Sequence, residues 1–228
     1  ANIFVPSESG YKLVQLADGV HSVHSLAYRE TFHPVIGPVA EAQALYVQQL
    51  NLRERVRSAG AAFVVWDVGL GAAGNPLTFL NAVRDLPAKV RLVSFDYTTE
   101  PLQLALENKD HLLFLKGWEP IVRELITEHR SRVRCVEGLS IDWTLQLGDF
   151  PTILRQPVDA PAPYAIFYDA FSPATNVAMW TLEVFTNLFR HLDSSRPCSM
   201  PTYSRSTMLR VTLLLAGFFV GKGHATGK

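Results

Sequence analysis

The chain has little of several features that mark particular protein classes. It has two cysteines, Cys135 and Cys198, which are too few and too far apart for a disulfide framework. It carries no excess of charge, because 21 basic residues balance 21 acidic ones, so its overall electrostatics do not favour a polyanionic partner. The mostly apolar stretch 211–220 is too short to span a membrane, and we see no signal peptide. We therefore expect a cytoplasmic protein without a membrane segment.

Metal ligands are also scarce. His21 and His24 lie three positions apart without a third ligand nearby, and the other five histidines are scattered. We expect no metal site. A hydrophobic content of 48% and a charged content of 18% are typical of a folded globular protein, and 228 residues suffice for one domain with a full core.

The most informative stretch contains a glycine-rich turn. An apolar run over 63–66 ends at Asp67, glycines follow at positions 69, 71 and 74, and Asn75 opens an apolar-periodic segment. This order predicts a buried strand, a tight turn and the start of a helix. Glycine lets the backbone approach a nucleotide closely, and the first turn of a helix offers free N–H groups.

The turn alone does not choose a cofactor, because Gly69-x-Gly71-x-x-Gly74 also fits the dinucleotide fingerprint. Three features favour S-adenosylmethionine over a nicotinamide cofactor. Asp67 stands two residues before the first glycine, about sixty residues precede the turn, and carboxylates recur at the ends of later strand-like runs. A dehydrogenase and a glycine turn without a ligand stay as alternatives.

The pattern of the whole chain predicts an α/β protein. Residues 1–60 read as an N-terminal extension, with a hairpin over 11–17 and 20–26 around Asp18-Gly19, a loop over 29–34 and a helix over 38–57. Residues 61–228 read as a Rossmann-like domain packed against that extension. Its later segments are predicted as strands 90–95, 132–137, 142–147, 164–168, 199–203 and 218–222 and helices 99–108, 119–130, 176–192 and 206–216. We expect a last, antiparallel edge strand to be missing, since the chain stops at Lys228.

Four carboxylates follow successive strand-like runs: Asp67, Asp96, Asp149 and Asp169. Ligands of open α/β sheets bind beyond the carboxyl ends of the strands, so these side chains should rim one crevice. Asp96 lies 25 residues after Gly71, where a carboxylate accepts hydrogen bonds from a ribose diol.

Longer motifs resemble a known family, the methyltransferase of the MnmC type, which completes the methylaminomethyl group on the wobble uridine of bacterial tRNA. The resemblance spans nearly the whole chain, and the run Asp169-Ala-Phe-Ser-Pro-Ala-Thr-Asn-Val-Ala-Met-Trp180 is its most specific part. Its other parts are Asp18-Gly19, Glu30–His33, 37–42, the glycine turn with Asn75, Ser94–Tyr97 with Pro101-Leu102, Gly148-Asp149, Thr202–Ser204 and Ala216–Phe218.

The resemblance implies a class I, S-adenosylmethionine-dependent N-methyltransferase that acts on the anticodon loop of tRNA, without the oxidase half of the bifunctional enzymes. Asp67, Gly69, Gly71 and Asn75 would hold the methionine end of the cofactor. Asp96, with Tyr97, would bind the ribose, Asp149 the adenine amine, and Asp169 would face the transferable methyl as the catalytic residue.

The predicted acceptor side consists of Phe171, Pro173, Arg205 and Arg210. Phe171 would stack on a flipped base or cap the core, and Pro173 would stiffen its loop. The two arginines follow the carboxyl end of a strand and should lie near the crevice mouth. Arg130, Arg132 and Arg134 fit either a phosphate contact or a solvated charged edge, and the second fits better.

The chain departs from the family pattern at several positions. Ala73 and Val177 replace a glycine and a proline, residues 193–197 replace a Pro-Gly-Gly turn, and Arg210 lacks a second basic residue beside it. Two other functions therefore stay open. One is methylation of a small-molecule amine or other metabolite, and the other is a nucleotide-binding module that has lost catalysis.

Overall fold

The computed structural model describes residues 10–224. Its central sheet has the strand order β6-β7-β5-β4-β8, with β4 (Phe63–Val68), β5 (Lys89–Asp96), β6 (Arg130–Arg134), β7 (Ser140–Leu147) and β8 (Ala165–Tyr168). Four strands are parallel, and β6 pairs antiparallel with β7 at one edge. The chain leaves β4 toward β5 on one side and later returns to β8 on the other, so the strand order reverses at β4. Ligands bind above such a reversal in open α/β sheets.

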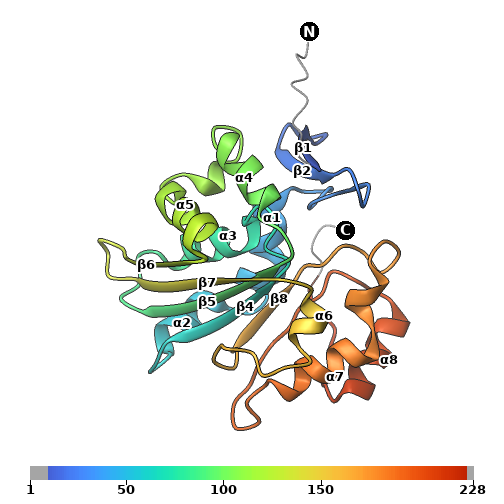
Figure 1. The fold of residues 1–228 in the computed structure, drawn as a ribbon. Helices are drawn as coiled ribbons and strands as arrows, with labels where there is room; N and C mark the ends of the chain where they lie inside the picture. The colour runs from blue at the N-terminus through green and yellow to red at the C-terminus, as the bar shows by residue number, and fades with distance from the viewer. Residues whose placement is uncertain (1–9, 225–228) are drawn as a thin grey trace.

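Helices cover both faces of this sheet, as Figure 1 shows. One face packs against α3 (Gly74–Val83), α4 (Glu100–Glu107), η2 (Leu113–Leu115) and α5 (Glu119–Glu128). The other packs against α6 (Phe150–Ile153), α7 (Leu182–Arg190) and α8 (Thr207–Ala216). Successive residues of β4 enter the two hydrophobic clusters in turn, because side chains alternate across a strand. The predicted Rossmann-like α/β class is confirmed.

The predicted N-terminal hairpin is also confirmed. β1 (Tyr11–Gln15) and β2 (His21–Ser25) pair antiparallel, and β3 (Glu30–Thr31) adds a third short strand. Gly19 takes a φ of 88° in the connecting turn, a conformation that glycine adopts without steric cost. This small sheet is separate from the central one and lies beyond the carboxyl ends of the parallel strands (Figure 1).

The helix predicted over 38–57 is divided into α1 (Pro38–Ala42), the π-helical segment η1 (Gln43–Gln48) and α2 (Leu52–Ser58). α1 runs directly into η1, and the break comes before α2, at Asn51, which has a φ of 49°. Asparagine tolerates this left-handed conformation better than most residues, so a local preference interrupts an otherwise continuous apolar stripe.

The C-terminal part differs from the expectation in three places. The helix predicted over 176–192 is split into η3 (Val177–Trp180) and α7, because Thr181 is extended and caps α7 by accepting the Val184 N–H. The strand predicted over 199–203 is reduced to one bridge between Ser199 and Ala165. The strand predicted over 218–222 was wrong: none of the described residues forms a strand that pairs with it, and Phe219 is fully exposed.

Within residues 10–224, no helix has the length and apolar character needed to cross a bilayer. Cys135 and Cys198 are both free thiols.

Candidate active site

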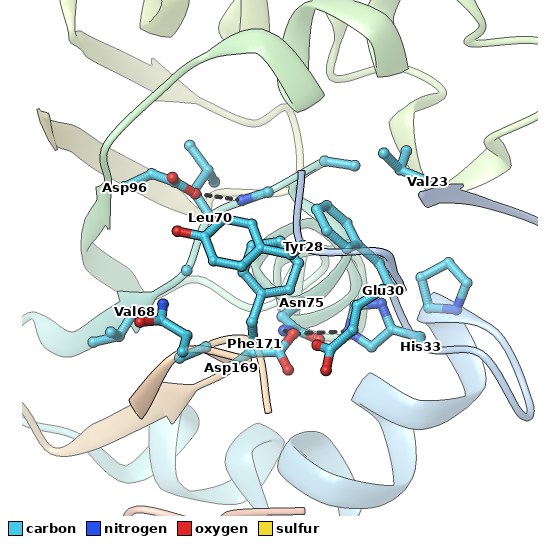
Figure 2. A pocket seen from close by; sticks show the side chains of 18 of the residues that line it. Val23, Tyr28, Glu30, His33, Val68, Leu70, Asn75, Asp96, Asp169 and Phe171 are labelled. Atoms are coloured by element: carbon cyan, nitrogen blue, oxygen red, sulfur yellow. Dashed lines mark hydrogen bonds and ion pairs between the residues drawn. The ribbon is translucent and has the colours of Figure 1, made fainter. Parts of the chain in front are cut away.

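A cavity of about 550 Å³ lies between the N-terminal sheet and the carboxyl ends of the central strands. This volume is within the range of about 300–1,000 Å³ that small-molecule sites occupy. The walls come from the segment between β2 and α1, the glycine turn, the residues after β5 and β7, and the loop after β8. Figure 2 shows side chains converging from the N-terminal segment, the glycine turn, the end of β5 and the loop after β8.

The glycine turn owes its composition to close backbone contacts. Gly69 has a φ of 87°, and a Cβ there would lie 2.5 Å from the carbonyl oxygen of Asp169. Gly71 has a φ of 53°, and a Cβ there would lie 2.9 Å from the ring of Phe32. Any side chain would therefore push apart the turn, the end of β8 and the N-terminal segment.

Asp96 is the last residue of β5 and braces this turn. Its Oδ2 accepts the Gly71 N–H at 2.9 Å, and its Oδ1 accepts the Tyr97 N–H at 2.8 Å. Burial raises the pKa of Asp96 more than these backbone hydrogen bonds lower it. Tyr97 is about half exposed at the cavity and exchanges a 2.8 Å hydroxyl–hydroxyl bond with Tyr11 of β1.

Asp67 is placed differently from the other predicted acids. It is fully buried within β4 and is not part of the cavity wall, so three of the four carboxylates line the crevice. Its Oδ2 accepts the Ser94 hydroxyl at 2.7 Å, and Ser94 in turn accepts the Trp143 indole N–H at 2.9 Å. Burial raises the pKa of Asp67 to about 8. Asp67 belongs to a central strand, and its side chain points into the core. It therefore lies beneath the turn and does not face the cavity.

Asp149 lines the cavity after β7 and caps α6. Its Oδ2 accepts the Thr152 N–H at 3.1 Å and the Thr152 hydroxyl at 2.5 Å. Both bonds use one oxygen of an exposed carboxylate.

Asp169 follows β8 and receives hydrogen bonds from two distant parts of the chain. The Asn75 side-chain amide, in the first turn of α3, donates to Asp169 Oδ2 at 2.7 Å. His33 Nε2 lies 2.8 Å from the same oxygen. The histidine and aspartate side chains are 9% and 19% exposed, so the contact is shielded from water. The motif Glu30–His33 was part of the resemblance, but the sequence did not single out His33 as a site residue.

The loop after Asp169 is fastened to the N-terminal segment by Glu30. Its carboxylate accepts the Ser172 N–H at 3.1 Å, the Ser172 hydroxyl, and the Thr175 hydroxyl at 2.8 Å. Burial raises the pKa of Glu30, but these hydrogen bonds outweigh that effect and lower it overall. Nothing in the sequence predicted that Glu30 would pair with Ser172 and Thr175.

Aromatic rings form the wall beside Asp169. Phe171 stacks on Tyr28 with ring centroids 4.2 Å apart and an interplanar angle of 20°, and Phe32 lies 5.6 Å from Phe171. All three rings line the cavity (Figure 2 labels Tyr28 and Phe171). Phe171 is therefore at the cavity rather than inside the core.

The remaining acceptor-side candidates do not line the cavity: Pro173, Arg205 and Arg210. Arg205 and Arg210 are exposed, and Arg210 lies on α8. The two arginines were expected near the crevice because they follow a predicted strand over 199–203. That segment forms only one bridge, so it does not carry the guanidinium groups to the cavity wall.

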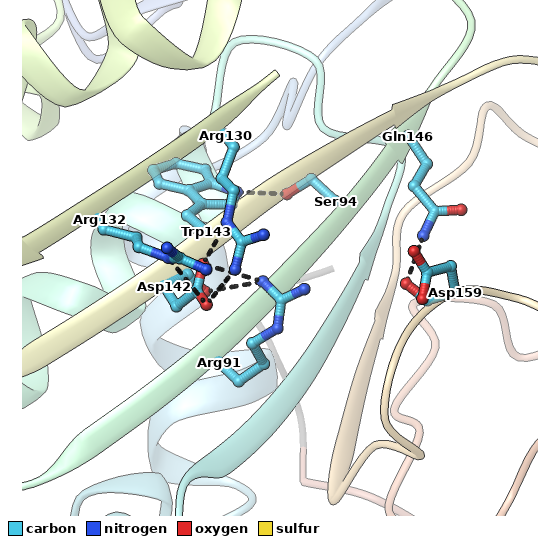
Figure 3. A network of polar contacts seen from close by, with 8 residues as sticks. All are labelled: Arg91, Ser94, Arg130, Arg132, Asp142, Trp143, Gln146 and Asp159. Atoms are coloured by element: carbon cyan, nitrogen blue, oxygen red, sulfur yellow. Dashed lines mark hydrogen bonds and ion pairs between the residues drawn. The ribbon is translucent and has the colours of Figure 1, made fainter. Parts of the chain in front are cut away.

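The arginines of the sheet edge form an ion-pair network far along the strands from the cavity. Asp142 of β7 pairs with Arg91 at 3.3 Å, Arg130 at 2.7 Å and Arg132 at 3.5 Å, as Figure 3 shows. Their guanidinium groups keep the pKa of Asp142 low despite the opposing effect of its burial. The interpretation of Arg130 and Arg132 as a charged edge agrees with these contacts.

The described residues contain no group of three or more His, Cys, Asp and Glu side chains that could hold a metal ion.

The cavity has the donors and acceptors that an S-adenosyl group requires. The glycine turn supplies a backbone cradle without side chains, and the carboxylates at the end of β5 and after β7 offer acceptors for a diol and an amine. In addition, Asn75 Oδ1 is buried at the turn without a hydrogen-bond partner among residues 10–224. A buried acceptor of this kind is costly unless a ligand satisfies it. The residues present therefore fit the cofactor.

A parallel sheet reversed at β4, with a glycine turn after that strand and acids after its neighbours, defines a class I methyltransferase fold. A family model described as S-adenosyl-L-methionine-dependent methyltransferase matches residues 113–228, just over half of the chain. The chain belongs to this family of enzymes.

Known relatives narrow the comparison. The chain is 29% identical over 205 residues to the "tRNA 5-methylaminomethyl-2-thiouridine biosynthesis bifunctional protein MnmC" of Burkholderia vietnamiensis, covering 84% of this chain and 30% of that protein. It is 26% identical over 219 residues to the protein of the same name from Pseudomonas putida, covering 90% of this chain and 32% of that one. The chain thus spans about a third of the length of these curated relatives.

Among solved structures, MNMC2 of Aquifex aeolicus superimposes with a TM-score of 0.73 and 24% identity, over 96% of this chain and 68% of that one. This likeness confirms the fold.

Proposed function

We propose that the protein methylates the aminomethyl group of a tRNA wobble uridine. The observation that carries the proposal is the Asp169 carboxylate at the cavity, held by Asn75 and His33 beside the glycine turn. The names of the two relatives reported above refer to the biosynthesis of a modified tRNA nucleoside, which supports RNA as the acceptor. A cytoplasmic location remains the expectation for such an enzyme.

We assign the cofactor end of the cavity to the turn and the acids around it. Gly69, Gly71 and Asn75 would hold the methionine end, and Asp67 would act indirectly, by joining β4 to β5 through Ser94 beneath the turn. Asp96 and Tyr97 would bind the ribose, and Asp149 would accept the adenine amine through the oxygen that Thr152 does not use. When bound, S-adenosylmethionine supplies a methyl group on a sulfonium for in-line displacement.

Asp169 would act on the acceptor amine. An aliphatic amine is mostly protonated near neutral pH and must lose a proton before its lone pair can attack, and it becomes cationic again as the new bond forms. A carboxylate beside it can accept a hydrogen bond from the neutral amine and stabilise the growing positive charge. Because the cavity wall is apolar and partly closed by the N-terminal sheet, this interaction is stronger than it would be in water.

The aromatic wall fits a base that has left its stack. Phe171 and Tyr28 offer π-faces beside Asp169, and stacking on such rings contributes about 1–3 kcal/mol per base. The anticodon loop makes its bases accessible at little cost, since they are not in a duplex. Pro173 would stiffen the loop that carries Phe171, and the exposed Arg205 and Arg210 would contact phosphates outside the cavity.

The test is mass spectrometry of nucleosides from tRNA that carries the aminomethyl group, after incubation with the protein and S-adenosylmethionine. We expect the modified uridine to gain one methyl group with the unsubstituted protein and with Asp159→Asn, whose exposed carboxylate lies outside the cavity. Methylation of free amines without methylation of tRNA would identify a small-molecule enzyme instead. Absence of any methyl transfer, with the cofactor bound, would indicate a binding module.

A further inference from the structure

His33 reaches the site from outside the Rossmann-like core. It lies between β3 and α1, 136 residues before Asp169 in the chain, yet its Nε2 is 2.8 Å from Asp169 Oδ2. Figure 2 shows the ring beside Asn75 and Asp169 at one end of the cavity. The family model begins at residue 113, so this contribution lies outside the matched segment.

Two donors on one oxygen fix the orientation of the carboxylate. Asn75 approaches Oδ2 from the first turn of α3, and His33 approaches it from the N-terminal segment. With one donor, the carboxylate could still rotate about that bond. With two donors from independent elements, the plane of the group is set, and so is the direction in which Oδ1 points. Catalytic groups lose much of their effect when displaced by about 1 Å, so this restraint matters for transfer.

The backbone at His33 supports a functional reason for the contact. His33 has a φ of 48°, a left-handed conformation that costs a non-glycine residue about 1–2 kcal/mol. The ring lies over the start of α3, where a Cβ at Gly74 would be 4.0 Å from His33 Cε1 and 3.0 Å from Pro38. Strain of this kind persists at sites where the surrounding structure requires a particular geometry.

The charge requirement of the reaction suits a neutral imidazole. A neutral ring with its proton on Nε2 donates to the carboxylate and adds no charge, so Asp169 keeps its full negative charge for the amine. A lysine or arginine at this place would neutralise that charge as the cation develops. In this neutral form the imidazole would orient Asp169 without competing with the acceptor, while the hydrogen bond itself needs only a proton on Nε2.

We propose that His33 is a positioning residue that holds the Asp169 carboxylate toward the acceptor amine. The proposal rests on the proposed function, because it presumes that Asp169 serves the acceptor. With this role for His33, the N-terminal segment would contribute to the reaction in addition to lining the cavity.

The kinetic test compares His33→Phe, which keeps a ring but has no donor, with His33→Gln, which restores an N–H at similar reach. On aminomethyl tRNA, His33→Phe should lower kcat by roughly 10–100-fold with KM changed less than about threefold. His33→Gln should recover most of that loss. S-adenosylmethionine affinity by calorimetry should stay within about twofold for both, since the cofactor end is unaltered.

The matched control is His129→Phe. His129 is also a histidine with a left-handed backbone, at a φ of 55°, but it ends α5 outside the cavity. Its replacement should leave kcat unchanged. Equal losses in His33→Phe and His33→Gln, a normal kcat in His33→Phe, or a change in KM alone would overturn the proposal.

A spectroscopic measurement separates this proposal from the proposed function. An imidazole N–H bonded to a carboxylate gives a downfield proton resonance, which should be present in the unsubstituted protein and absent from both His33→Phe and Asp169→Ala. Its absence from the unsubstituted protein would overturn the positioning role whatever the substrate is. If the resonance is present but tRNA is not methylated, the proposed function fails while the contact stands.

Discussion

The two ends of the cavity are built in different ways. The proposed cofactor end comes from one short stretch, the turn after β4, together with Asp96 at the end of β5 and Asp149 just after β7. The acceptor end joins the segment over 28–33 to the loop over 169–175, which are far apart in the sequence. The first end is held mainly by backbone groups and the second mainly by side chains.

This difference shows where each end tolerates change. At the cofactor end, Asp96 bonds to backbone N–H groups, and Gly69 touches the backbone of Asp169, so that substitution disturbs the sheet itself. At the acceptor end, Glu30 and His33 contact side chains and one N–H of a surface loop. Exchanges there can alter the acceptor while the cofactor site persists. We therefore expect substitutions around the glycine turn to disturb the fold more than substitutions around Glu30 and His33.

The largest effect is expected at Asp169. Asp169→Asn keeps the shape of the side chain and removes the charge, so methylation of tRNA should slow by roughly a hundredfold or more. Because asparagine keeps an oxygen that can accept the Asn75 amide, the glycine turn should stay in place, and calorimetry should give S-adenosylmethionine affinity within about twofold of the unsubstituted value. A parallel loss of cofactor affinity would break the distinction between the two ends, and near-normal turnover would show that this carboxylate is not catalytic.

A smaller effect is expected at Asp96. Asp96→Ala removes a charged acceptor from the predicted ribose site and should weaken S-adenosylmethionine binding by about 1.5–3 kcal/mol. Calorimetry measures this directly, and the KM for tRNA at saturating cofactor should barely change. Unaltered cofactor binding would show that the ribose contact lies elsewhere. Tight binding of a nicotinamide dinucleotide in place of S-adenosylmethionine would overturn the assignment of the whole turn.

More of the residues predicted from the sequence line the cavity at its glycine-turn end than at its Phe171 end, because the signals of the turn are local. The apolar run of β4, the glycines and Asn75 lie within about a dozen positions, and Asp96 follows one βα unit later. The contact between His33 and Asp169 depends on how the N-terminal sheet lies over the core, and no local pattern specifies that. Asp67 shows a further limit, since its position at a strand end did not reveal that its side chain points into the core.

Errors in secondary structure also have local causes that periodicity overlooks. Asn51 and Thr181 interrupt long apolar stripes through a left-handed conformation and a side-chain cap. The apolar segment 218–222 has strand-like composition, but a strand forms only where a partner offers hydrogen bonds, and no strand pairs with it among residues 10–224.

One carboxyl group near each end of the cavity should make the free energy of unfolding depend on pH, and the two dependences should have opposite signs. The first group is Asp67, which lies beneath the glycine turn. Burial raises its folded pKa from 3.8 to about 8, so the folded protein keeps a proton that the unfolded chain has released. The stabilisation is complete below the unfolded value, declines as pH rises, and is lost above the folded value. The slope in this window is at most about 1.4 kcal/mol per pH unit.

Urea unfolding of the cofactor-free protein between about pH 5 and pH 8 tests this expectation. The free energy of unfolding should fall as the pH rises, and Asp67→Asn should flatten the slope because it cannot ionise. Asp159→Asn, an exposed site, serves as the control and should keep the original slope. Equal slopes for all three proteins would show that Asp67 does not hold a proton in the folded state.

The smallest effect is expected at the acceptor end, from Glu30. Its hydrogen bonds from Ser172 and Thr175 lower its folded pKa below the ordinary value of 4.5, even though burial acts in the opposite direction. The resulting stabilisation is present above the unfolded pKa and is lost as the pH falls through the folded one. Because Glu30 is only partly buried, solvent screening limits the contribution to about 1 kcal/mol or less. Glu30→Gln should therefore lower the free energy of unfolding slightly at pH 7 and by less still near pH 4, which urea titrations at the two values would measure.

The same substitution should raise the KM for tRNA and leave cofactor affinity unchanged, since the loop that carries Phe171 is then held less firmly. A larger loss at pH 4 than at pH 7, or a loss of cofactor affinity, would contradict the assignment of Glu30 to the acceptor end alone.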